Sequence, residues 1–116
     1  MARVFLRLDF APGTRLGPGK IALLEEIDRT GSISAAGRAL GMSYRRAWLL
    51  VDDLNKLFGA PVVATQLGGS HGGGASLTEL GNDLVARFRA LERAAEPLVR
   101  EHLGPLEAMA GRSGDG

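Results

Sequence analysis

The spacing of apolar and polar positions predicts a succession of helices and short strands along the chain. Residues 4–10 alternate between the two kinds, with an apolar face of Val4, Leu6, Leu8 and Phe10, which is typical of a strand. Apolar residues then recur at helical spacing from Pro18, a residue favoured in a first helical turn, until Gly31 ends the pattern. The stripe on this predicted helix consists of Ile21, Leu23, Leu24 and Ile27.

A longer helical pattern begins near Ser43 and stops at residues 59–61, because Pro61 disfavours helical geometry in the residue before it. Its apolar face carries Ala47, Leu50, Val51, Leu54, Leu57 and Phe58. Arg45 falls on the opposite side of this helix, so we expect it to point away from the core. Trp48 lies at the edge of the apolar face, and we expect it to belong to the core.

Residues 31–48, GSISAAGRALGMSYRRAW, predict two short helices joined by a glycine turn. We expect Ser34 to cap the first and Ser43 the second, because a serine hydroxyl accepts an otherwise unpaired amide hydrogen. Gly41 supplies backbone that adopts positive φ where the first helix ends. The first turn of the second helix carries Tyr44, Arg45 and Arg46. This is the helix-turn-helix arrangement, whose second helix enters the DNA major groove; an ordinary helical hairpin with solvated arginines is the alternative.

Two β-prone runs, residues 62–66 and 75–77, flank the glycine-rich segment 68–74 and predict a hairpin. A hairpin after the helix pair makes a wing, so the fold class is a mainly α winged helix-turn-helix with a small β wing. The glycine segment lacks the Lys-Ser or Lys-Thr that a phosphate-binding P-loop needs. It is either a wing tip that touches DNA through Ser70 and His71 or a loop without such a role.

The last helix is expected from residue 79, capped by Thr78, to about Leu103. Pro97 predicts a kink or a new helix start near its end. A heptad-like seam favours a symmetric dimer over packing within the same domain, and it consists of Leu84, Phe88, Leu91, Ala95 and Leu98. The expected organisation is a winged helix-turn-helix domain over 1–77, a dimerisation helix over 78–109 and a disordered tail over 110–116.

Charge supports a polyanionic partner more through its distribution than through the net value of +1. Residues 29–51 hold four arginines and no acid, although a chance gap in acidic residues is the alternative. The chain has no cysteine and two histidines, so we expect no disulfide, no metal site and no cofactor. No apolar run is long enough to span a bilayer and no secretory signal is evident, so a cytoplasmic location is expected.

These observations assign a role to each candidate contact with double-stranded DNA. Arg45 or Arg46 can read guanine O6 and N7 through a bidentate contact. Tyr44 is expected either to contact DNA or to pack on Trp48. Contacts with phosphate that set the register are expected from Ser32, Ser34 and Arg38. An enzyme is not expected, because the neighbouring Asp52 and Asp53 diverge by about 100° on a helix and cannot converge on one substrate.

Residues 16–92 resemble the N-terminal DNA-binding domain of ModE-type molybdate-responsive regulators, which is itself similar to the winged helix-turn-helix of LysR-type regulators. The run GSISAAGRALGMSYRRAW and the later GGSHGGGASLTELG carry this resemblance. It implies a homodimeric transcription factor on a palindromic operator. The segment 43–46 matches the start of the family's recognition helix, and 68–74 matches its wing.

Full-length members of that family add a C-terminal molybdate-binding part, for which we find no counterpart in these 116 residues. We therefore do not expect a direct molybdate switch. We expect either a stand-alone regulator or one that needs a separate molybdate-binding partner. The alternative function is a winged-helix protein-interaction module, or a co-regulator, without DNA affinity of its own.

Overall fold

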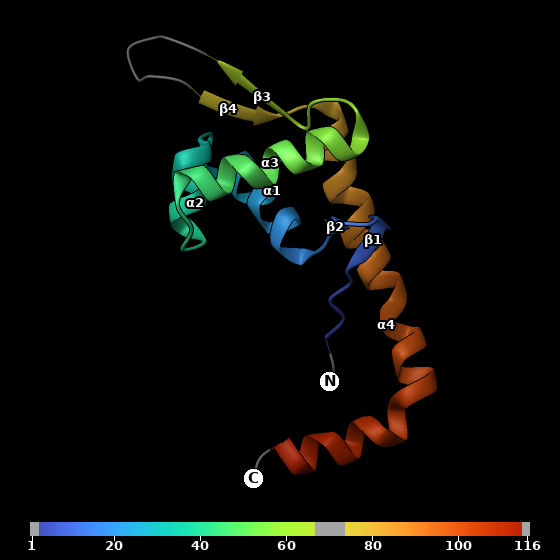
Figure 1. Cartoon of the computed structure of the whole chain (residues 1–116). Helices are drawn as coiled ribbons and strands as arrows, with labels where there is room; N and C mark the ends of the chain where they lie inside the picture. Colours follow the sequence, from blue (N-terminus) through green and yellow to red (C-terminus); the bar gives the residue numbers. More distant parts are fainter. Residues whose placement is uncertain (1–2, 67–73, 115–116) are drawn as a thin grey trace.

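The computed structural model describes residues 3–66 and 74–114, and within them it confirms the predicted winged helix-turn-helix. In Figure 1 the three shorter helices form one body, β3 and β4 lie along it, and α4 runs away from it. The elements are β1 (Leu8–Ala11), β2 (Thr14–Leu16), α1 (Pro18–Thr30), α2 (Ile33–Ala39), α3 (Tyr44–Phe58), β3 (Val63–Gln66), β4 (Gly74–Leu77) and α4 (Glu79–Gly114).

The N-terminal strand is shorter than predicted and belongs to a hairpin. β1 begins only at Leu8, where it gains an antiparallel partner in β2. The register shifts between Asp9 and Ala11, and such a bulge changes the face to which side chains point. Phe10 is consequently exposed rather than on the inner face with Leu8, and its ring meets the edge of Phe58 at a centroid distance of 6.2 Å.

The core forms where the predicted apolar stripes of α1 and α3 meet. All four stripe residues of α1 are fully buried, as are Ala47 and Leu54 of α3, whereas Leu50, Leu57 and Phe58 are half-buried. Burying a large apolar side chain contributes about 1.5–3 kcal/mol, so this cluster orients α3 against α1. The outer side of α3, which carries Arg45, is left facing solvent.

Hydrogen bonds donated by backbone amides attach the base of the wing to α3 and α4. The Val62 amide donates to Asn55 Oδ1 of α3 at 2.8 Å, and the Thr78 amide donates to the Val62 carbonyl at 3.0 Å. Thr78 caps α4 as predicted, since its Oγ1 accepts from the Gly81 amide at 3.1 Å. The first turn of α4 therefore fixes where β3 starts.

α4 extends beyond the predicted end near Leu103 and continues to Gly114 through Pro97 and Pro105. The segment from residue 110, expected to be a disordered tail, is part of this helix as far as Gly114. An interior proline removes one amide donor, but its fixed φ is helical, so the helix continues on both sides. Figure 1 shows the red end of α4 turning away from the direction of its first part.

The predicted dimer seam divides between two environments. Leu84 and Phe88 pack into the chain's own core, with Phe88 only 3% exposed, because α4 must first cover the domain that it leaves. Ala95 is half-buried. Leu91 and Leu98 are exposed, together with the more C-terminal Leu103, Leu106 and Met109.

An ion cluster fixes α4 against α1. Arg89 donates to Glu25 of α1 and to Glu92 of α4, each at 2.7 Å. The hydrogen bond to Glu25, followed by the one to Glu92, raises the pKa of the Arg89 guanidinium above its usual value. Glu92 is buried, so its carboxylate needs this cationic partner to offset the loss of hydration.

Candidate nucleic-acid interface

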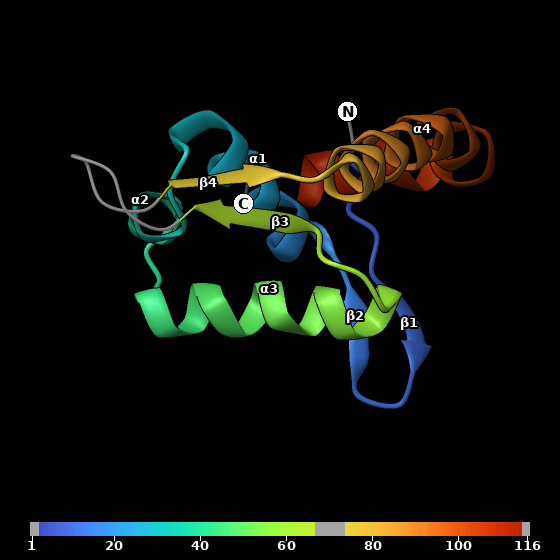
Figure 2. The ribbon, with the colours of Figure 1, turned by 90° about the horizontal axis from the view of Figure 1, so that it is seen from above.

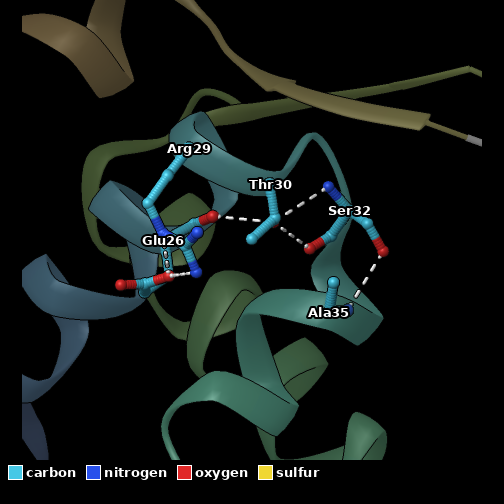
Figure 3. Close-up of polar contacts among 5 residues, drawn as sticks. All are labelled: Glu26, Arg29, Thr30, Ser32 and Ala35. Atoms are coloured by element: carbon cyan, nitrogen blue, oxygen red, sulfur yellow. Dashed lines mark hydrogen bonds and ion pairs between the residues drawn. The ribbon is translucent and has the colours of Figure 1, made fainter.

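The turn from α1 to α2 is held by a network around Thr30, drawn in Figure 3. Thr30 Oγ1 donates to the Glu26 carbonyl at 2.7 Å and accepts from the Ser32 amide at 3.3 Å. Gly31 ends α1, as predicted, and its backbone lies in the left-handed region at φ 72°. Its carbonyl accepts from the Ala75 amide at 2.9 Å, which joins this turn to β4 of the wing.

The N-cap of α2 is Ser32 and not Ser34, so that prediction was wrong by two residues. Ser32 has extended backbone and its Oγ accepts from the Ala35 amide at 3.1 Å. Ser34 lies inside the first turn, where its hydroxyl accepts a hydrogen bond from Arg38 at 2.9 Å. Both serines could serve as caps by residue type, and the Thr30 network selects the earlier one.

We expect Ser32→Ala to lower the free energy of unfolding by about 1 kcal/mol, because the Ala35 amide loses its acceptor. Ser34→Ala is the matched control and should change it by less than about 0.5 kcal/mol, since only an exposed side-chain contact is lost. Urea denaturation followed by circular dichroism measures both. Equal losses in the two variants would contradict this assignment of the cap.

The turn between α2 and α3 brings the two helices into close contact. Gly41 adopts φ 70°, as predicted, and the Met42 amide donates to the Gly37 carbonyl at 2.9 Å. A β-carbon at Gly37 would lie 3.3 Å from that of Ala47, so the small residue lets α2 approach α3. Ser43 caps α3 as predicted, accepting from the Arg46 amide at 3.1 Å.

The first turn of α3 presents unpaired cationic side chains to solvent. Tyr44, Arg45 and Arg46 are exposed, and across residues 3–66 and 74–114 neither guanidinium has a hydrogen bond or ion pair. The helix dipole adds partial positive charge at this same end. An exposed helix start with two unpaired arginines is suited to contact an anion or a base edge.

Trp48 is not part of the core, contrary to the prediction. It is 36% exposed, and its indole N–H donates to the Tyr44 hydroxyl one turn earlier. The two rings meet edge to face at a centroid distance of 6.5 Å. The core is complete without Trp48 because Ala47 and Val51, which precede and follow it on α3, are the residues buried there. Tyr44 thus packs on Trp48, one of its two expected roles.

A groove of about 340 Å³ lies where α2, α3 and the wing meet. Figure 2 shows β3 and β4 running beside α3 toward α2. The predicted contacts that the structure brings together here are Ser32, Ser34 and Tyr44, and Trp48 lines the groove beside them. Sequence reasoning missed Thr65 and Gln66 of β3, which also line it and are exposed. The sequence signal for these two residues was weak, because they are polar positions of a short strand in which only Val63 is buried.

The carboxylates of α3 are paired and lie in its second half. Asp52 binds Lys56 at 2.8 Å, and Asp53 lies 3.7 Å from Lys20 of α1. The hydrogen bond to Asp52 raises the pKa of Lys56 above its ordinary value. No carboxylate is among the described residues that line the groove, so its lining carries no negative charge.

Other predicted contacts lie elsewhere. Arg38 is exposed on α2 and is not among the described residues that line the groove. Ser70 and His71 fall outside the described residues. Within the described ranges, no helix is long and apolar enough to cross a membrane, and no group of three side chains could ligate a metal.

Comparison with known sequences places this geometry in a family of regulators. The pattern described as "Bacterial regulatory helix-turn-helix protein, lysR family" matches residues 19–82. The molybdenum-pterin-binding protein MopB of Rhodobacter capsulatus is 44% identical over 106 residues, covering 87% of this chain and 39% of that protein. The molybdenum transport protein ModE of Azotobacter vinelandii is 44% identical over 87 residues, covering 75% of this chain and 32% of that protein.

Less similar proteins include further transcriptional regulators. The DNA-binding transcriptional dual regulator ModE of Escherichia coli K12 is 31% identical over 112 residues, covering 93% of this chain and 43% of that protein. A crystal structure of a LysR family transcriptional regulator aligns with a TM-score of 0.57 and 19% identity, covering 78% of this chain and 29% of that one. This last similarity concerns the fold alone. The chain spans less than half the length of these relatives.

Proposed function

Because the chain belongs to the lysR family of bacterial regulatory helix-turn-helix proteins, we propose that it is a sequence-specific DNA-binding transcriptional regulator. The observation that carries this proposal is the first turn of α3, where Arg45 and Arg46 are exposed and, within the described chain, unpaired. In this role α3 enters the major groove, and one of these arginines reads a guanine through two parallel hydrogen bonds.

The groove supplies contacts that set register. Ser32 and Ser34 can donate their hydroxyl hydrogens to phosphate oxygens, and Thr65 and Gln66 can do so from the wing side. Arg38 stands near the DNA backbone as a further phosphate ligand, because its guanidinium has donors beyond the one held by Ser34. Such contacts fix orientation without carrying sequence information.

The protein acts as a homodimer on an inverted repeat in this proposal. The exposed apolar residues of α4 support it, since Leu91 and Leu98 are one heptad apart and uncovered. A two-fold axis along α4 would present two copies of α3 to successive major grooves about 34–36 Å apart. Leu84 and Phe88 do not contact the partner chain in this proposal. They hold α4 on its own domain and so position the exposed part of the helix.

A link to molybdenum is proposed from the names of the relatives, which are called molybdenum transport and molybdenum-pterin-binding proteins. In that case the operator lies at genes for molybdate uptake. Control by molybdate through a separate oxyanion-binding protein is part of the same proposal. Non-enzymatic action and cytoplasmic location follow from a role in transcription.

Selection of bound duplexes from a random library, with purified protein at near-physiological salt, tests the function. The expected result is an enriched inverted repeat whose half-sites are about one helical turn apart. Binding to the selected duplex should weaken steeply as salt rises, because each phosphate contact releases counterions. Sedimentation of the complex should give two protein chains per duplex.

Failure to enrich any sequence, with the protein folded, would contradict the proposal. Weak binding to every duplex, with an affinity that does not change with salt concentration, would also contradict the proposal. It would favour a protein-interaction module. An enriched single half-site would leave sequence-specific binding in place and contradict the dimer.

A further inference from the structure

The outer side of α3 carries an apolar surface that the arginine contacts do not use. Leu49 is 52% exposed and follows Trp48, which is itself partly exposed. Together with Tyr44, Arg45 and Asp52 they line a shallow hollow of about 410 Å³. Exposed leucine and tryptophan side by side on a recognition helix leave apolar area in water, which is unfavourable unless a ligand covers it.

Hydrogen bonding within the helix makes this surface more apolar than its residue types suggest. The indole N–H of Trp48 is already donated to the Tyr44 hydroxyl, so it is not offered to a base acceptor. What Trp48 presents outward is the rest of its ring. The neighbouring Asp52 carboxylate is engaged by Lys56 at 2.8 Å.

We propose that Leu49 and Trp48 read thymine by contacting its C5-methyl group, next to the guanine read from the first turn of α3. This inference rests on the proposed function. The thymine methyl is the apolar group that base edges display in the major groove, and apolar side chains contact it there. Charge selects DNA over an apolar protein surface, because Arg45 lines the same hollow and is unpaired within the described chain.

The arrangement gives the half-site two different kinds of readout. Arg45 lies at the second helical position of α3, and Leu49 follows one turn later on the same side, so their targets are neighbouring base pairs. One arginine selects guanine by hydrogen bonds, whereas Leu49 selects thymine over cytosine by the methyl group. The preferred half-site therefore contains a thymine within one or two base pairs of the guanine.

Replacing each thymine of the selected duplex by uracil tests this, since uracil pairs identically and lacks only the methyl group. For the unaltered protein, we expect about a fourfold loss of affinity at one or two positions in each half-site, the value of one buried methyl group. Leu49→Ala should bind both duplexes with nearly equal affinity. Phe5→Ala is the control: that phenylalanine is 60% exposed, lies outside both α3 and α4, and its variant should keep the uracil penalty.

Trp48→Phe, which keeps an apolar ring but loses the indole N–H, should also keep the penalty. Specific binding that is indifferent to uracil at every position would overturn the inference and leave the proposed function standing. A uracil penalty that persists unchanged in Leu49→Ala would overturn the assignment to this surface. Absence of sequence-specific binding in the library selection would overturn both.

Discussion

Gly81→Ala should lower the free energy of unfolding by about 3 kcal/mol, the largest loss that we expect from adding a single methyl group. A β-carbon at Gly81 would overlap the carbonyl oxygen of Val62 and lie 3.2 Å from its carbonyl carbon. That carbonyl also accepts from the Thr78 amide, so it cannot move without breaking the bond that starts α4. The clash is with backbone and has no rotamer to relieve it.

The stability gained by placing alanine in a helix is smaller than the loss from this clash. Alanine is favoured over glycine inside a helix by up to about 1 kcal/mol, which offsets only part of the clash. Gly19→Ala isolates that gain, because a β-carbon there meets nothing within 4 Å and Gly19 lies in the first turn of α1. We expect Gly19→Ala to be neutral or slightly stabilising.

Thermal unfolding followed by circular dichroism measures both variants. For a domain of this size, the loss at Gly81 should lower the Tm by on the order of 10 °C. A Gly81→Ala protein as stable as Gly19→Ala would show that α4 and Val62 do not approach as closely as described. The wing base would then not be fixed by the first turn of α4.

The regular elements were predictable because each carries its own local signal. The apolar stripe of α1, the Ser43 and Thr78 caps and the glycines at 31, 41 and 59 decide where helices start and stop through steric and hydrogen-bonding effects within a few residues. The same local signals predict which face of α3 is apolar. Helical spacing within α3 is therefore sufficient to place Arg45 on the outside.

The exceptions depend on contacts between distant parts of the chain. Ser32 became the cap of α2 through Thr30, whose position is set by the end of α1. Phe10 left the inner face because β1 has a bulge opposite β2. Trp48 stayed outside because smaller residues completed the core around it. Residue type favours burial of a tryptophan, but the space available in the core decides it.

The candidate interface was predictable in its centre and not at its edges. The arginines of α3 follow from a capped helix start, which is a local feature. Thr65 and Gln66 join Ser32, Ser34 and Tyr44 in the groove only because β4 is hydrogen-bonded to the carbonyl of Gly31, which brings the wing alongside α2. A contact between segments so far apart in sequence cannot be predicted from the few residues around either partner.

Arg45→Ala should weaken binding to the selected duplex by about 1–3 kcal/mol, or roughly 5- to 150-fold, if its fork reads a guanine. If Arg46 reads the guanine instead, Arg46→Ala should cause this loss of affinity. Arg45 would then contact phosphate. The two roles differ in a measurable way, because a phosphate contact is lost equally from selected and random duplexes and lowers the salt slope by about 1.

Arg87→Ala is the matched control, since it removes the same charge from an exposed ion pair with Asp83 on α4, away from the wing groove. It should leave the ratio of selected to random binding unchanged. Affinity measured by fluorescence anisotropy on both duplexes at several salt concentrations separates the cases. Equal losses on both duplexes for Arg45→Ala and Arg46→Ala would contradict base reading by either arginine. Sequence preference would then have to come from the apolar surface of Leu49 and Trp48 or from the wing.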